Sequence, residues 1–98
     1  MSAEFLQQLE EIIDQRMASG DDSSYTRRLI DKGLHKIAQK VGEEGVETAL
    51  AAVSGVDEQL IEEAADLIFH LLVLLRVKNL GLAQVVAVLE GRHAASQG

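Results

Sequence analysis

The sequence contains no cysteine among its 98 residues, which excludes disulfides, thiol catalysis and cysteine-ligated zinc. It also lacks proline and tryptophan and has only 3% aromatic residues. Its hydrophobic residues, 47% of the chain, are therefore mainly leucine, isoleucine, valine and alanine. These residues suit helix packing, and together with the helical periodicity described below they predict an all-α bundle of four to five helices.

Positive charge is also scarce. The chain has nine lysines and arginines and 16 aspartates and glutamates, which give it a net charge of −7 and a pI of about 4.8. This balance argues against a nucleic-acid-binding or membrane-surface protein, since both use basic patches. A glycine-rich phosphate loop, a GxSxG, an HExxH and a dinucleotide-binding motif are absent as well. An acidic protein can still bind a phosphorylated substrate when a metal and local basic residues screen the charge.

No segment has the pattern of a membrane span or a signal peptide. The apolar run 67–75 is too short to cross a bilayer, and the first residues lead into an amphipathic segment. We therefore expect a soluble cytoplasmic protein. We also expect residues 1–98 to form one domain with a loose tail at 95–98. A chain this short buries a small fraction of its surface, so association into a homo-oligomer would be favourable.

Helical spacing of apolar residues predicts four main helices and one short one. The main helices are expected at 3–18, 34–53, 58–78 and 82–93. The short helix is expected to begin at Tyr25 with Ser24 as its N-cap, and Asp57 is expected to cap the third main helix. Because the run 67–75 is apolar nearly all round, we expect it to be covered on several sides.

Two pairs of acidic residues stand out beside this apolar run. Glu44 and Glu47 are three residues apart, as are Glu63 and Asp66, so each pair shares a helix face. Carboxylates in such a place are costly unless a cation meets them. If the pairs face each other, they form an oxygen-rich site suited to Mg²⁺. The alternative is a merely solvated acidic helix face, since runs of charged residues are common on helix surfaces.

Nearby residues add to this pattern. Gly42 and Gly45 lie in mid-helix, where each costs roughly 1 kcal/mol relative to alanine. They suggest close approach by a helix or a ligand, although simple packing would also account for them. His70 follows Asp66 by one turn, and a core histidine with satisfied nitrogens is favoured there over a metal ligand.

Basic residues near the acids are candidates for phosphate contacts. Lys36 and Lys40 precede the acidic residues by one to two turns, and Arg27 and Arg92 lie elsewhere in the chain. Each has a simpler alternative. Lys40 can pair with Glu44 across one helical turn, Arg27 can serve solubility, and Arg92 can complement a helix C-terminus.

The segments 40–47 and 62–75, which carry the two acidic pairs, resemble the phosphoribosyl-ATP pyrophosphohydrolase family. That family belongs with the MazG-like all-α nucleotide pyrophosphohydrolases, and the likeness extends from Phe5 to His93. The paired ExxE and ExxD motifs are typical of the superfamily as a whole. The segments 24–26 and 90–93 are what point to the histidine-biosynthesis branch.

The resemblance implies hydrolysis of phosphoribosyl-ATP to phosphoribosyl-AMP and pyrophosphate, the second step of histidine biosynthesis. It also implies a bound Mg²⁺. The implied metal ligands are Glu44, Glu47, Glu63 and Asp66. Glu43 is implied as an accessory ligand or a base that orients water, so Glu43, Glu44 and Glu47 are the candidate catalytic acids. Which of them is the base is open.

The resemblance further implies a homodimer, or a dimer of dimers, with active sites near the interface. The apolar run 67–75 independently asks for a partner chain, so we expect the dimer to form through this helix. The chain departs from the family pattern at two positions: Phe69 stands where tyrosine is common, and Gly45 where alanine is more usual. Two rival functions use the same residues. One is a house-cleaning pyrophosphatase for other nucleoside triphosphates, and the other is a non-enzymatic dimeric helical bundle.

Overall fold

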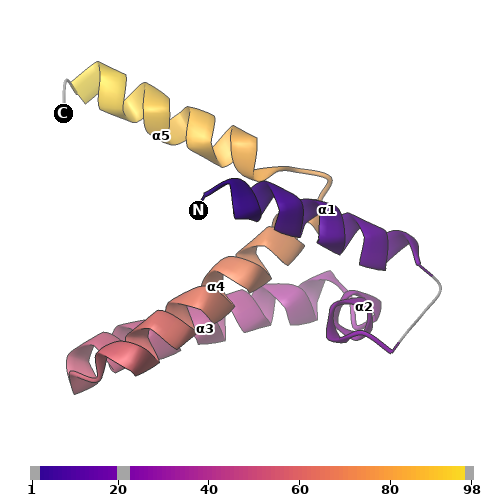
Figure 1. Cartoon of the computed structure of the whole chain (residues 1–98), viewed down its shortest axis with the longest axis horizontal. Coiled ribbons are helices and arrows are strands. Elements are labelled where there is room, and N and C mark those ends of the chain that lie inside the picture. Colours follow the sequence, from indigo (N-terminus) through magenta and orange to yellow (C-terminus); the bar gives the residue numbers. More distant parts are fainter. Residues whose placement is uncertain (1–2, 20–22, 97–98) are drawn as a thin grey trace.

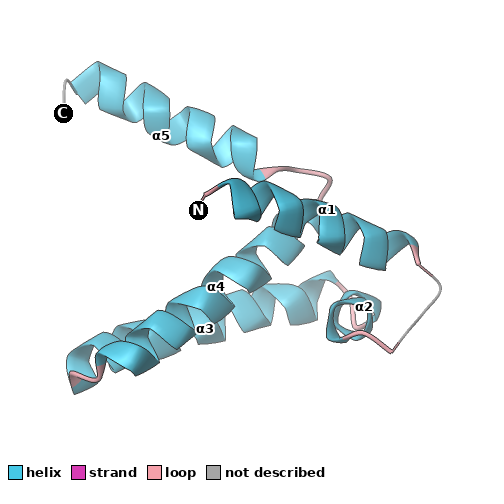
Figure 2. Ribbon diagram, viewed as in Figure 1, coloured by secondary structure: helices cyan, strands magenta, loops and turns pink. Residues whose placement is uncertain are grey.

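A computed structural model describes residues 3–19 and 23–96 of the chain, and in this part it contains only helices and loops (Figures 1 and 2). The five helices are α1 (Glu4–Ala18), α2 (Tyr25–Asp31), α3 (Leu34–Ser54), α4 (Asp57–Val77) and α5 (Leu82–Ser96). The predicted all-α class is therefore confirmed. The predicted cap of the short helix is confirmed too, because Ser24 Oγ accepts a hydrogen bond from the Arg27 backbone N–H at 3.0 Å.

The two longest helices, α3 and α4, form an antiparallel hairpin and lie side by side in Figure 1. The connection between them is short because Gly55 takes a left-handed conformation, with φ of 84°, directly after α3. Glycine adopts this conformation without the steric cost that a Cβ would bring. The hairpin places the acidic residues of both helices in its middle, on facing elements.

The buried core lies at one end of the hairpin, where α1 and α2 pack against it. Its fully or nearly buried apolar residues are Ile13, Leu29, Ile37, Leu72 and Val73. The opposite end of the hairpin is much less covered, since Val53 is 86% exposed and Ile61 is 68% exposed. One end of the hairpin is thus anchored in the core, while the other projects from it.

A bidentate ion pair joins α1 to α4. Arg76 Nε and Nη2 donate to the two carboxylate oxygens of Asp14 at 2.9 and 2.8 Å. Close by, Glu10 Oε2 accepts a hydrogen bond from the Leu82 backbone N–H at 2.7 Å, which fixes the first residue of α5 to α1. Beyond this turn α5 extends away from the hairpin (Figure 1), and its residues Val88 and Leu89 are exposed.

Some sequence-based expectations differ from the structure. Asp57 is the first residue of α4 and not its cap, because Val56 precedes it in an extended conformation. The helix α5 continues to Ser96, so the first two residues of the predicted loose tail are helical, while 97–98 lie outside the described residues. The run 67–75, by contrast, is covered on several sides as expected: His70, Leu72 and Val73 are buried, and only Ile68, at 44%, is exposed.

No described helix is by itself long and apolar enough to cross a membrane. Only α4 and α5 taken together reach that length and composition, and they are bent by 108° at the break between them.

Candidate metal centre

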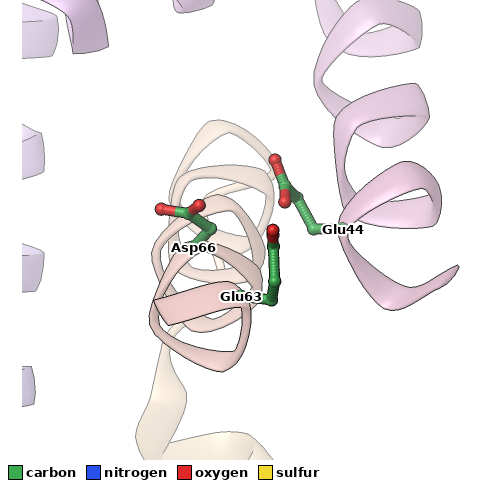
Figure 3. Close-up of side chains that lie close together, drawn as sticks. All are labelled: Glu44, Glu63 and Asp66. Carbon is green, nitrogen blue, oxygen red and sulfur yellow. The ribbon is translucent and has the colours of Figure 1, made fainter. Parts of the chain in front are cut away.

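Three carboxylates from the two hairpin helices converge on one point (Figure 3). Glu44 comes from α3, and Glu63 and Asp66 come from successive turns of α4. One oxygen of each lies within 4.8 Å of the others. The structure thus brings together three of the four residues that the sequence suggested as metal ligands.

Glu44 is the innermost of the three, with only 6% of its surface exposed. Its Oε1 lies 3.8 Å from Lys40 Nζ, but its Oε2 is buried and has no hydrogen-bond partner. A buried carboxylate oxygen without a partner is costly. An additional cation between Glu44 and the two α4 carboxylates would remove that cost.

Glu47 lies beside this group. Its pKa is raised above the ordinary value, mainly because its carboxyl can donate a hydrogen bond to Glu44 only when it is protonated, and also because the Glu44 charge repels its own. Glu47 and Glu63 additionally line one shallow pocket of about 260 Å³ between α3 and α4. Glu47 therefore extends the three-carboxylate group along α3, next to the buried carboxylate of Glu44.

Glu43 has a different environment. Gln39 Nε2 donates to its carboxylate at 2.8 Å, and this bond, followed by the positive charges of Lys40 and Lys36, lowers the pKa of Glu43. Glu43 is exposed and is not one of the three converging residues. It is an ionised carboxylate on the same helix, one residue before the innermost acid.

The predicted phosphate-binding residues divide into two groups. Lys40 contacts Glu44, as the salt-bridge alternative predicted, and the charge of Lys36 acts on Glu43. Arg27 is engaged elsewhere: it donates to the carbonyls of Met17 and Ser19 and pairs with Asp31, so it joins the end of α1 to α2.

Arg92 is exposed on α5. Because α5 extends away from the hairpin, the structure does not bring Arg92 to the carboxylates of its own chain.

The two mid-helix glycines do not mark a close approach within the described residues. A Cβ added at Gly42 or Gly45 would meet nothing within 4 Å, so neither glycine is in close contact with another described element, and the approach of a ligand or a partner helix stays a prediction. Gly42 instead lines an open, largely apolar hollow of about 470 Å³ on α3, together with Val46 and the side chains of Gln39, Glu43 and Glu47.

Sequence reasoning identified His70 as a core histidine but missed its partner. His70 is 5% exposed, its Nε2 lies 2.9 Å from the Tyr25 hydroxyl, and its Nδ1 lies 2.7 Å from the Asp66 carbonyl oxygen. Both ring nitrogens are satisfied, in line with the favoured interpretation. The Tyr25 contact spans 45 positions, and no local pattern could have indicated it.

Comparison with known protein families shows which family the chain matches. The family model described as phosphoribosyl-ATP pyrophosphohydrolase matches residues 6–93, which cover all three converging carboxylates. The chain belongs to this family. As a member of the phosphoribosyl-ATP pyrophosphohydrolase family, it is a hydrolase that acts on a pyrophosphate bond.

Similar proteins occur in distant organisms. A phosphoribosyl-ATP pyrophosphatase of Pyrobaculum calidifontis is 55% identical over 92 residues, covering 94% of this chain and 98% of that protein. One from Erythrobacter litoralis is 54% identical and covers 93% of this chain and 88% of its own. A histidine biosynthesis bifunctional protein of Xylella fastidiosa is 52% identical, with 92% of this chain matching 44% of that longer protein.

Proposed function

We propose that this chain hydrolyses phosphoribosyl-ATP to phosphoribosyl-AMP and pyrophosphate in the second step of histidine biosynthesis, with Mg²⁺ as its cofactor. The observation that carries the proposal is the convergence of Glu44, Glu63 and Asp66, with one buried oxygen of Glu44 left without a partner. The names of the relatives supply the substrate and the pathway. The substrate is a soluble small molecule, and we place the reaction in the cytoplasm.

The residues present fit a magnesium ion. Mg²⁺ prefers carboxylate and other hard oxygen ligands in proteins. Glu44, Glu63 and Asp66 offer three such oxygens within 4.8 Å of one another and would hold the ion between α3 and α4. Glu47, which lies one turn after Glu44 on α3 and whose pKa the Glu44 carboxylate raises, is the proposed fourth ligand. When bound, Mg²⁺ would neutralise charge on the diphosphate leaving group.

The remaining polar residues of α3 have separate proposed roles. Glu43 stays ionised because its pKa is lowered, and its exposed carboxylate can accept a hydrogen bond from the attacking water and orient it. The water oxygen bonds to the α-phosphorus as the bond from that phosphorus to the α–β bridging oxygen breaks, which releases pyrophosphate. Lys40 and Lys36, respectively one and two turns before Glu43 on the same helix, are the proposed phosphate contacts.

We also propose that the active form is a homodimer. The Cα radius of gyration is 15.0 Å, whereas a compact chain of this length has about 13 Å. Apolar residues are exposed at the projecting end of the hairpin and along α5, including Val53, Ile61 and Val88. A second copy would cover these surfaces. In such a dimer Arg92, which does not reach the carboxylates of its own chain, would be available to a site of its partner.

The proposed reaction is tested by measuring pyrophosphate release from phosphoribosyl-ATP with Mg²⁺, beside ATP, dUTP and dCTP. We expect release from phosphoribosyl-ATP and its loss in Glu63→Gln. Glu62→Gln is the matched control, since Glu62 is the adjacent, exposed acid outside the converging group. Release only from the other nucleotides would indicate a house-cleaning enzyme. No release from any of them would indicate that the carboxylates are a solvated helix face.

A further inference from the structure

The acidic face of α4 ends at a buried histidine. Glu63, Asp66 and His70 are spaced three and four residues apart, so they follow one another along a single face of the helix. Along this face exposure falls from the open carboxylate of Asp66 to the imidazole of His70, which is 5% exposed. His70 therefore closes the carboxylate site at its inner end, one turn from a proposed metal ligand.

The hydrogen bonds of His70 fix the position of its proton. The Asp66 carbonyl oxygen, 2.7 Å from Nδ1, can only accept, so Nδ1 carries the hydrogen. When the ring is neutral, Nε2 is then the acceptor, and the Tyr25 hydroxyl 2.9 Å away is the donor. Two successive hydrogen bonds thus connect the Tyr25 hydroxyl, the His70 ring and the backbone carbonyl of Asp66.

Aromatic contacts hold the same ring from two sides. The Phe69 and Tyr25 rings meet it edge-on, with centroids 5.2 and 5.9 Å away, and Phe69 and Tyr25 lie 6.2 Å apart. Edge-to-face contacts of this kind favour one ring orientation. The imidazole is thus held in place by its packing as well as by its hydrogen bonds.

The Tyr25–His70 contact joins elements that are far apart in sequence. Tyr25 is the first residue of α2, a helix of only seven residues, and it is 46% exposed. Burial of its ring therefore does not by itself explain why it lies against α4. Burying an imidazole at this position, where an apolar side chain would fill the core, is favourable only because both nitrogens are satisfied. A fully satisfied polar contact sets one orientation of the two helices.

We propose that Tyr25 and His70 are positioning residues of the carboxylate site: their hydrogen bond holds α2 against α4 and fixes the turn that carries Asp66. The proposal rests on the proposed function only in taking Asp66 as a cation ligand. Interactions one step removed from metal ligands commonly change metal affinity when they are lost. Tyr25→Phe, which removes only the hydroxyl, should therefore weaken cation binding in the absence of any substrate.

The test is Mg²⁺ titration of the full-length protein by calorimetry at a temperature well below unfolding. We expect the Kd of Tyr25→Phe to be about 10-fold higher than that of the unaltered protein, the lower end of the effect of losing an interaction that supports a metal ligand. The control is Asp14→Asn, which weakens the Arg76 ion pair ten residues further along α4. It should lower the Tm by a similar amount and leave the Kd for Mg²⁺ unchanged. A merely structural role of Tyr25 predicts the same behaviour for both variants.

Two further measurements distinguish the positioning role from an effect on folding, and neither depends on the proposed reaction. In His70→Asn the amide can keep the bond to the Asp66 carbonyl but loses Tyr25, so adding Tyr25→Phe to it should raise the Kd little further. In NMR spectra of the unaltered protein, His70 should be the Nδ1–H tautomer, and its ring nitrogens should shift on addition of Mg²⁺.

Mg²⁺ binding by the unaltered protein with an unchanged Kd in Tyr25→Phe would overturn the positioning role alone. No Mg²⁺ binding by the unaltered protein would overturn the metal centre itself, and the positioning role with it.

Discussion

Glu44 Oε1 lies 3.8 Å from Lys40 Nζ, while the other oxygen of the same buried carboxylate has no partner. One lysine at this distance is a weak compensation for a nearly buried charge that also faces Glu63 and Asp66. The geometry is that of a site whose electrostatic cost is reduced when a divalent cation binds. We therefore expect the Glu44 carboxylate to destabilise the metal-free protein. We expect the same carboxylate to be the one through which bound metal stabilises the protein.

Glu44→Gln separates these two effects. The amide keeps the shape of the side chain and removes the charge, so we expect the metal-free variant to be at least as stable as the unaltered protein. The unaltered protein should gain about 2.7 kcal/mol when Mg²⁺ is at 100 times its Kd, and the variant should gain much less. Thermal melts over a range of Mg²⁺ concentrations measure both quantities. An equal Mg²⁺-induced rise in Tm for both proteins would exclude Glu44 as a ligand.

The raised pKa of Glu47 predicts a specific pH dependence when no divalent cation is present. A carboxyl whose pKa is raised on folding binds its proton more tightly in the native state. Its contribution to stability is then fully present below the unfolded pKa of about 4.5 and is lost as the pH rises through the folded pKa. In EDTA, the unaltered protein should therefore lose stability relative to Glu47→Gln as the pH is raised from 4 to about 7.

Glu43 is the control for this prediction, because its pKa is shifted in the opposite direction to that of Glu47. Its pKa is lowered, chiefly by the hydrogen bond from Gln39, so its contribution is present above the unfolded value and is lost as the pH falls through the folded pKa. Urea unfolding at several pH values, with Glu43→Gln beside Glu47→Gln, compares the two. Parallel pH profiles for the two variants would contradict the arrangement in which the Glu44 carboxylate raises the pKa of Glu47 while Gln39 lowers that of Glu43.

The helices and the acidic pairs were predictable from the sequence because their causes are local. The period of the apolar residues places α3 and α4 to within a residue or two, and the three-residue spacing of Glu63 and Asp66 already puts them on one face. The convergence with Glu44 follows from the hairpin once Gly55 is recognised as its turn. Each of these inferences needs only neighbouring residues in the chain.

What could not be predicted depends on contacts between distant segments. The pairing of Tyr25 with His70 and of Asp14 with Arg76 is set by how α1 and α2 cross the hairpin, which no local pattern encodes. The same holds for Arg27, whose guanidinium turns to the end of α1 and not to the phosphate site. Basic residues were harder to assign than acids because one lysine or arginine suits many surroundings.

Gly42 should be replaceable by alanine with a gain in stability. It lies inside α3, and an added Cβ would meet nothing within 4 Å, so Gly42→Ala should raise the free energy of unfolding by about 1 kcal/mol. Gly55→Ala should have the opposite effect. The backbone φ at Gly55 is 84°, which strains any residue with a Cβ, so the free energy of unfolding should fall by about 1 kcal/mol or more. Urea unfolding measures both. Destabilisation by Gly42→Ala would mean that another molecule presses on this face of α3.

The exposed apolar residues of α5 allow a test of the proposed dimer, because a single charge placed among them should weaken association. If a second copy covers Val88, then Val88→Asp places a carboxylate in an apolar interface, and burying an unpaired polar group costs roughly 1–3 kcal/mol or more. The dissociation constant of the dimer should rise about tenfold or more, since each 1.4 kcal/mol is a factor of ten. Light scattering over a dilution series measures it, with Glu90→Gln as a control on the same exposed helix. If Val88→Asp dissociates at the same concentration as the unaltered protein, then α5 is not the interface. In that case the apolar end of the hairpin, around Val53 and Ile61, is where a second copy should be sought.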